Sequence, residues 1–196
     1  MIIRLANEED ANGILEIYAP YILNTSLTFE TEVPDQRAFK ERIRSYLIIW
    51  PWLVCESDGK IAGYAYGTRY RERVAYQWGT EVSVYIHDDF HRKGIAKALY
   101  TAVLEILKNQ GFRNAYAVIN LPNDQSVAFH ESCGFKYFAT YENVGYKLGK
   151  WKNVGWWQIQ LNEYSHEPEA PVKFSELNKE FLPALFERVQ KMIMAK

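Results

Sequence analysis

Residues 81–110 read EVSVYIHDDFHRKGIAKALYTAVLEILKNQ, and this stretch decides the fold. In residues 81–86 apolar side chains alternate with others, which is the period of a β-strand with one buried face. In residues 94–109 the apolar residues recur at helical spacing, and Gly111 is placed to end that helix. We therefore expect a strand, a basic loop containing Gly94 and a helix N-terminus in succession.

The loop before this helix has the properties of an anion site. Backbone N–H groups at a helix N-terminus are unpaired, and the helix dipole favours negative charge there. Gly94 lets a phosphate approach the backbone, Ala96 keeps the next turn small, and Arg92 and Lys93 add positive charge. The spacing is neither that of a P-loop nor that of a dinucleotide-binding fingerprint. A pyrophosphate suits the loop, and an ordinary basic helix start is the alternative.

Outward from this segment, the pattern predicts an α/β (α+β) fold with a mixed central sheet flanked by helices. Asn7 and Asp10 have the spacing of a capping box, Pro34 is expected to open the second helix, and residues 57–59 signal a hairpin. Strands are expected at 2–5, 52–56, 60–66, 78–86, 113–119, 135–141 and 154–161. Helices are expected after residue 7, after residue 34, over 94–109, and from 123 or 124 to 134, in the order β-α-α-β-β-β-α-β-α-β-β.

Composition limits the classes of function. The chain has 196 residues, of which 48% are hydrophobic, and a formal net charge of −1. That balance predicts neither a nucleic-acid-binding protein nor one bound to anionic membranes, and no apolar run has the length of a membrane span. The two cysteines, Cys55 and Cys133, have no metal-site or disulfide-framework spacing, so we expect reduced thiols in a cytoplasmic protein. We expect no bound metal.

After Leu161 the composition changes. Residues 167–171 read as a linker, and apolar residues from Leu177 to Ile193 then repeat at helical spacing. We expect one domain over residues 1–161 and an extension over 162–196 that consists of a linker and an amphipathic helix. That helix is expected to dock on its own domain or on a second subunit.

The loop resembles the Q/R-x-x-G-x-G/A motif with which GNAT acetyltransferases bind the pyrophosphate of coenzyme A; His91 stands at the Gln or Arg position. Residues 123–135 resemble the family's downstream signature N-x-x-A/S-x-x-x-Y-x-x-x-G-F, with His130 in place of the Tyr. Residues 1–161 are similar to the phosphinothricin/methionine sulfoximine acetyltransferase branch. The supporting segments are 28–32, 46–54, 75–78, 81–86, 121–124, 145–147, 151 and 154–158.

The resemblance implies a GNAT acyl-CoA N-acyltransferase fold, acetyl-CoA as co-substrate and a homodimer with substrate sites near the interface. In the family the Asn at the position of Asn123 contacts the pantetheine arm. The cofactor-binding residues it implies are Val84, Tyr85, Ile86, Arg92, Lys93, Gly94, Ile95, Ala96, Lys97, Asn123 and Ser126.

In this family the amine attacks the thioester directly, so the reaction needs a proton acceptor and a polarised carbonyl but no Cys or Ser nucleophile. Glu81, on the strand before the loop, is the candidate base; a structural ion pair with Arg69, Arg71 or Arg73 is the alternative. His130 is the candidate acid or base, because it holds the family's acid position.

The loop over residues 67–76 mixes Arg with Tyr, and an Arg there can clamp a carboxylate or the phosphinyl, sulfone or sulfoximine oxygens of an acceptor. A solvated charged loop is the alternative. The candidate substrate-binding residues are Phe29, Arg69, Arg71, Arg73, Tyr76 and Trp78.

We therefore expect acetyl transfer to the amino group of a small acceptor of the phosphinothricin, methionine sulfoximine or methionine sulfone type. Another small amine, a peptide N-terminus, or a non-catalytic acyl-CoA-binding sensor are the alternatives.

Overall fold

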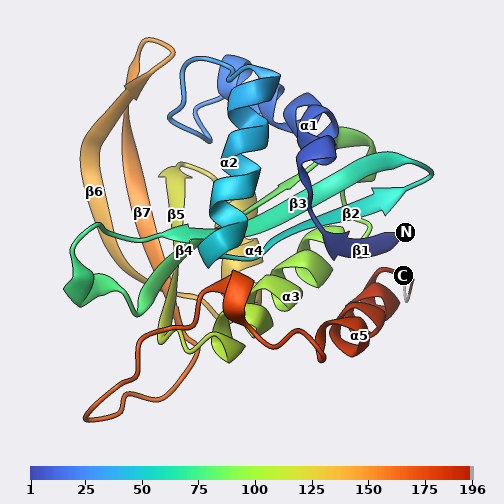
Figure 1. The fold of residues 1–196 in the computed structure, drawn as a ribbon. Helices are drawn as coiled ribbons and strands as arrows, with labels where there is room; N and C mark the ends of the chain where they lie inside the picture. Colours follow the sequence, from blue (N-terminus) through green and yellow to red (C-terminus); the bar gives the residue numbers. More distant parts are fainter. Residues whose placement is uncertain (195–196) are drawn as a thin grey trace.

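The computed structural model describes residues 1–194 and consists of a seven-stranded mixed sheet, in the order β1-β2-β3-β4-β5-β7-β6, with helices on both faces (Figure 1). The predicted fold class is confirmed, the elements follow the predicted order, and the C-terminal extension contains the helix that was expected there. The strands are Ile2–Leu5 (β1), Trp52–Ser57 (β2), Lys60–Arg69 (β3), Gly79–Ile86 (β4), Asn114–Leu121 (β5), Lys136–Lys147 (β6) and Lys150–Gln160 (β7). The helices are Ala11–Asn24 (α1), Gln36–Ile49 (α2), Ile95–Asn109 (α3), Asp124–Ser132 (α4) and Leu182–Met194 (α5).

Some predicted boundaries are wrong. Helix α2 does not open at Pro34; Asp35 has an extended backbone, and its Oδ1 accepts a hydrogen bond from Ala38 N at 2.7 Å, which makes it the N-cap. Strands β6 and β7 extend well beyond the predicted ranges and meet at a tight turn, where Leu148 and Gly149 have φ of 51° and 74°. The outer part of this hairpin is largely exposed and is held by strand pairing rather than by burial. The burial pattern therefore gave no signal for it.

Alternate residues of each central strand enter two different hydrophobic cores. In β2, Leu53 and Cys55 pack into the core that contains α3 and α5, whereas Trp52 and Val54 pack beneath α1 and α2. Both sets are completely buried, and for this reason the strand reads as a nearly continuous apolar run. The two cores fix β3 and β4 from both faces.

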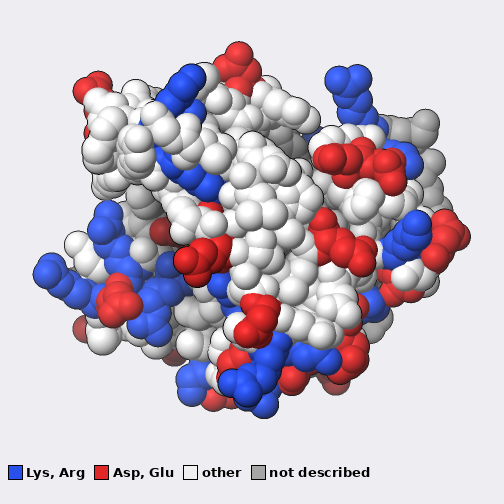
Figure 2. Space-filling view, turned by 90° about the horizontal axis from the view of Figure 1, so that it is seen from above, with Lys and Arg blue, Asp and Glu red and all other residues white. Residues whose placement is uncertain are grey.

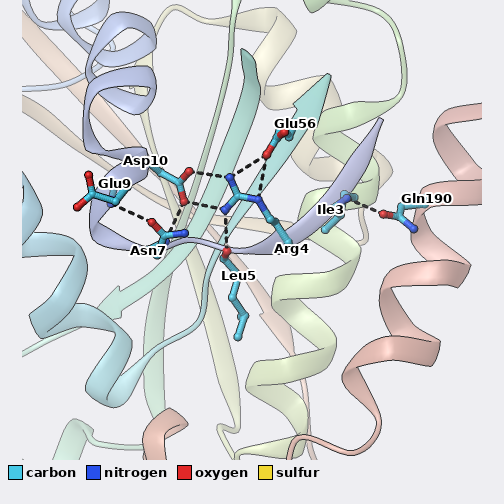
Figure 3. Close-up of polar contacts among 8 residues, drawn as sticks. All are labelled: Ile3, Arg4, Leu5, Asn7, Glu9, Asp10, Glu56 and Gln190. Carbon is cyan, nitrogen blue, oxygen red and sulfur yellow. Dashed lines mark hydrogen bonds and ion pairs between the residues drawn. The ribbon is translucent and has the colours of Figure 1, made fainter. Parts of the chain in front are cut away.

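The predicted capping box at Asn7 and Asp10 is present and is extended into an ion-pair network. Asp10 Oδ2 accepts from Asn7 N at 2.8 Å, and the Arg4 guanidinium lies between Asp10 Oδ1, at 2.7 Å, and Glu56 Oε2, at 2.9 Å (Figure 3). Asp10 is only 7% exposed, so its carboxylate depends on these donors. The network joins β1 to β2 and to the start of α1.

Helix α5 returns to the first strand of the same chain. Leu185 and Val189 are buried against the core around α3, and Gln190 Oε1 accepts a hydrogen bond from Ile3 N at 2.7 Å (Figure 3). Figure 1 accordingly shows α5 near β1. The division of the chain at residue 161 stays a prediction.

No helix in the part of the chain that the structure describes is both long and apolar enough to cross a membrane. On the face shown in Figure 2, acidic and basic side chains are interspersed around an uncharged central band. A mixed pattern of this kind agrees with the net charge of −1.

The Arg4 network gives a stability prediction. Replacement Asp10→Ala removes a buried carboxylate, breaks the capping box and leaves Arg4 with Glu56 alone. We expect a loss of about 2–3 kcal/mol in the free energy of unfolding, measured by urea titration. The matched control is Glu9→Ala, which removes an exposed pair with Lys40 and should cost about 0.5 kcal/mol or less. Equal losses in the two variants would show that the network adds nothing beyond a surface pair.

Candidate active site

Strands β4 and β5 lie side by side for only three residue pairs. Their parallel register joins Gly79 to Asn114, Thr80 to Ala115 and Glu81 to Tyr116, and then ends. Beyond that point β4 stays paired with β3 as far as Ile86, and β5 stays paired with β7. The strands therefore diverge after Glu81, and the β5-facing edge of β4 has backbone groups without a strand partner.

The divergence opens a cleft of about 660 Å³ between the two strands. Its walls are residues 82–86 of β4, 118–120 of β5, the loop over 90–94, the start of α3 and helix α4. Every residue predicted to bind the cofactor lines this cleft: Val84, Tyr85, Ile86, Arg92, Lys93, Gly94, Ile95, Ala96, Lys97, Asn123 and Ser126. The structure thus gathers residues from three separated segments at one place.

The loop before α3 is shaped to present its backbone N–H groups. Arg92 has φ of 62° and Gly94 has φ of 84°, and left-handed residues in such a turn make a concave nest of amide donors. His91 Nε2 lies 3.2 Å from the carbonyl oxygen of Ile86, which ties the loop to the end of β4. Arg92 and Lys93 are exposed beside it. This is a cationic, donor-rich rim suited to a pyrophosphate.

Gly94 has a second constraint that the sequence did not reveal. A Cβ at this residue would lie 3.1 Å from the carbonyl oxygen of Met192 and 3.7 Å from Cα of Ile193, at the end of α5. The open space that a glycine provides is therefore used by the C-terminal helix. Gly94 permits both the left-handed turn and the close approach of α5.

Helix α4 carries two of the predicted residues on its first turn. Asn123 is the N-cap, and its Oδ1 accepts from Ser126 N at 3.1 Å. That bond fixes the orientation of the side-chain amide and leaves its NH₂ group available as a donor to a ligand in the cleft.

His130 is held by two internal hydrogen bonds. Nδ1 lies 2.7 Å from the carbonyl oxygen of Ser126, which can only accept, so Nδ1 carries the proton. Nε2 lies 3.0 Å from the hydroxyl of Tyr100 and accepts a hydrogen bond from it. Burial lowers the pKa of His130, so the imidazole is neutral. His130 borders the cleft, and its acid or base role stays a prediction.

Glu81 occupies the last paired position before the strands diverge. Within residues 1–194 its carboxyl group forms no hydrogen bond and no ion pair, so the alternative of a structural pair with Arg69, Arg71 or Arg73 finds no contact to support it. Burial raises the pKa of Glu81 to about 7, and the charge of Arg71 acts in the opposite direction. An unpaired carboxyl with this pKa can exchange a proton near neutral pH.

The predicted substrate residues are not all brought together. Tyr76 and Trp78 line a second cavity, of about 250 Å³, at the other end of the paired segment. Arg71 lies over the Tyr70 ring and reaches the Tyr141 hydroxyl at 3.4 Å, whereas Arg69 and Arg73 are exposed and border neither cavity. The tip of the Phe29 ring packs against Gly145 of β6, where a Cβ would lie 2.3 Å from the Cζ atom, and Phe29 lines neither cavity.

Several lining residues were not predicted. Val118 and Asn120 of β5 border the cleft, and Tyr70, Arg113 and Tyr116 border the second cavity. The alternation of β5 gives a signal for Val118 and Asn120, because Ala117 and Ile119, which alternate with them, are buried in the α3 core. Within residues 1–194 no group of His, Cys, Asp and Glu is placed to hold a metal ion.

Comparison with known proteins agrees with this geometry. The family model for the acetyltransferase (GNAT) domain matches residues 3–156. A phosphinothricin N-acetyltransferase of Streptomyces viridochromogenes is 37% identical over 80% of this chain and 85% of its own length. An L-methionine sulfoximine/L-methionine sulfone acetyltransferase of Salmonella typhimurium is 30% identical over 87% of this chain and 99% of its own. A GNAT superfamily phosphinothricin acetyltransferase of Sinorhizobium meliloti, solved in complex with AcCoA, superposes with a TM-score of 0.81 at 30% identity and covers 85% of this chain and 92% of its own.

The double constraint on Gly94 leads to a prediction with an internal control. Gly94→Ala places a Cβ at a positive φ and against Met192, whereas Gly59→Ala introduces the same kind of φ, 77°, with no atom within 4 Å. We expect Gly59→Ala to cost about 1 kcal/mol from backbone strain and Gly94→Ala about 2 kcal/mol or more. Thermal unfolding measures the difference, and faster hydrogen exchange at the end of α5 should accompany only Gly94→Ala. Equal effects would show that α5 does not press on the loop.

Proposed function

The chain belongs to the GNAT acetyltransferase family, and from that premise we propose that it transfers the acetyl group of acetyl-CoA to the amino group of a small amino-acid-like acceptor, with Glu81 as the base. The observation that carries the proposal is the position of an unpaired, desolvated carboxyl at the point where β4 and β5 diverge. Glu81 itself lines neither cavity; Ser83, two residues after it on β4, lines the cofactor cleft, and Gly79, two residues before it, lines the second cavity.

The cleft fits coenzyme A by the chemistry of its donors. The nest at Arg92 and Gly94 would hold the pyrophosphate, and the Asn123 amide would donate to the pantetheine arm. The free backbone edge of β4 beyond Glu81 offers N–H donors that can polarise a thioester carbonyl. Acetyl-CoA supplies the acetyl thioester when bound.

Glu81 would accept the proton that the acceptor's ammonium group must lose before its nitrogen can attack. The nitrogen then bonds to the carbonyl carbon and the carbon–sulfur bond breaks. The second proton that the nitrogen loses as the amide forms goes to the leaving thiolate, so coenzyme A departs as the thiol. A carboxyl with a pKa near 7 is matched to this task at neutral pH. No side-chain nucleophile is needed.

We assign His130 to positioning. Its imidazole joins the Tyr100 hydroxyl on α3 to the carbonyl of Ser126 on α4, across the space between the two helices. Because both nitrogens are engaged, the residue holds Ser126 of α4 in place and transfers no proton itself.

Arg71 is the candidate clamp for the acceptor's carboxylate. Its guanidinium is exposed, lies near enough to Glu81 to affect that pKa, and is steadied by the Tyr70 ring and the Tyr141 hydroxyl. An acceptor carboxylate at Arg71 would place its α-amino group toward Glu81. This arrangement favours free amino acids over polyamines or peptide N-termini.

We also propose a homodimer, with the β6–β7 hairpin as the contact. This hairpin exposes the large apolar residues Tyr137, Phe138, Val144, Tyr146 and Trp151, and β6 is an edge strand. An exposed apolar edge of this kind is a common site of self-association.

Both cysteines are free, which supports a cytoplasmic location.

The proposed reaction is tested by following thiol release from acetyl-CoA with a panel of amines. We expect turnover of phosphinothricin, methionine sulfoximine or methionine sulfone, weaker turnover of ordinary amino acids, and none of polyamines. Turnover of a peptide N-terminus alone would redirect the assignment to peptides. Tight binding of acetyl-CoA without turnover of any amine would point to a sensor domain.

The role of Glu81 predicts a specific pH dependence. A base must be ionised, so kcat should fall as the pH drops below about 7, where the Glu81 carboxyl takes up its proton. Glu81→Gln should lower kcat by about 100-fold or more at neutral pH and abolish this limb.

Matched variants separate this role from structural effects. Glu81→Asp should keep the limb at a reduced rate, and Glu72→Gln, in the exposed loop, should leave the whole profile unchanged. His130→Gln should keep the limb near pH 7, because its imidazole is not the base. A limb that survives in Glu81→Gln but is lost in His130→Gln would reverse the two assignments.

A further inference from the structure

The second cavity is partly walled by the segment that follows β7. Tyr164, Ser165 and Pro168 border it, together with Arg113 and the aromatic rings of β5 and the 70–78 loop. These three residues lie beyond residues 3–156, which the family model matches. The cavity therefore combines a GNAT strand with a wall that the family pattern does not supply.

The wall is held by specific polar contacts. Trp78 Nε1 donates to the carbonyl oxygen of Glu169 at 2.8 Å, and the Tyr164 hydroxyl donates to Asn114 Oδ1 at 2.9 Å. Arg113 Nη2 donates to Ser165 Oγ at 3.3 Å. Contacts at both of its ends and in the middle keep this segment against β4 and β5.

Arg113 is a cation without a counter-charge. Within residues 1–194 it forms no ion pair, and its Nε is buried and has no hydrogen-bond partner. The neighbouring Tyr116 ring stacks on Tyr70 with centroids 4.1 Å apart, and burial raises the pKa of Tyr116 to about 12, so its phenol stays a donor. A guanidinium among phenol hydroxyls is suited to oxygens that carry negative charge.

The cavity lies in line with the reacting centre. Gly79 lines the second cavity and Ser83 lines the cofactor cleft, and both lie two residues from Glu81 on the same face of β4. Each is therefore about 7 Å from Glu81 along the strand. An acceptor with its amino group at Glu81 has the cofactor cleft on one side and this cavity on the other.

We propose that the second cavity is the acceptor's side-chain subsite, in which Arg113 binds terminal oxygens that carry negative charge, such as those of a sulfone, sulfoximine or phosphinate group. The inference rests on the proposed acetyl transfer and adds a residue and a wall that determine specificity. The aromatic rings enclose the aliphatic part of the side chain, and the segment over 164–169 closes the pocket.

The test compares two acceptors that differ only in the terminal oxygens, methionine sulfone and methionine. In Arg113→Gln, kcat/KM for methionine sulfone should fall about tenfold or more, while kcat/KM for methionine changes less than about twofold. Arg113→Lys should retain part of the preference. Arg37→Gln, an exposed residue of α2 that borders neither cavity, is the matched control and should change neither.

Equilibrium binding keeps this proposal separate from the proposed reaction. Calorimetric titration of methionine sulfone into protein saturated with coenzyme A should show the same dependence on Arg113 without any turnover. Binding that depends on Arg113 without acetylation would support the subsite and overturn the reaction. Acetylation of both acceptors with an unchanged preference, or an equal loss for both, would overturn the subsite. If Arg113→Gln fails to fold, Tyr164→Phe, which removes one hydroxyl of the wall, should lower the preference for the sulfone about threefold, and an unchanged preference would overturn the proposal.

Discussion

The parallel pairing of β4 with β5 ends after Glu81 and Tyr116, and the rest of the site depends on that early end. Strand β5 is committed to β7 along its whole length, and β4 is committed to β3, so the two strands can part without losing their outer partners. Tyr100 of α3 stands in the space below them, completely buried, with its hydroxyl on His130. A cleft can therefore open inside the sheet while both hydrophobic cores stay closed.

This geometry explains why an unpaired carboxyl is tolerated in the interior. Glu81 lies beside a gap rather than within a continuous ladder, and burial raises its pKa from 4.5 to about 7. The raised pKa lowers the free energy of unfolding when the carboxyl is ionised. This loss is absent below the ordinary pKa of 4.5, where the group is protonated in both states, and it is complete above about pH 7. The Arg4–Asp10–Glu56 network has the opposite character, because each of its carboxylates has a donor. The Arg4–Asp10–Glu56 network stabilises the fold, whereas the site at Glu81 retains a reactive carboxyl.

The sequence predicted what is local and missed what is distant in the chain. Three features depend only on residues that are close together in the sequence. They are the strand, loop and helix over 81–110, the capping box at Asn7, and the turn at Asp58 and Gly59. The pairing of Trp78 with Glu169 spans 91 residues, and no periodicity encodes it. The contact of Phe29 with Gly145 likewise depends on where the β6–β7 hairpin lies. The residues expected at the cofactor cleft were identified by two short motifs, each contiguous in the sequence, whereas the acceptor side is assembled from long-range contacts.

The C-terminal segment contacts both ends of the site. Its first part packs beside Arg113 at the second cavity, and the end of α5 lies on Gly94 at the cofactor loop. Between these points, Val172 and Gln110, at the end of α3, form two hydrogen bonds with each other. Gln110 Nε2 donates to the carbonyl oxygen of Val172 at 2.7 Å, and Val172 N donates to the carbonyl oxygen of Gln110 at 2.8 Å. Helix α3 is thus held at its C-terminal end by the same segment that holds its N-terminal loop. Since an anion site at a helix N-terminus depends on the placement of that helix, the tail stabilises the cofactor loop through α3 as well as by direct contact.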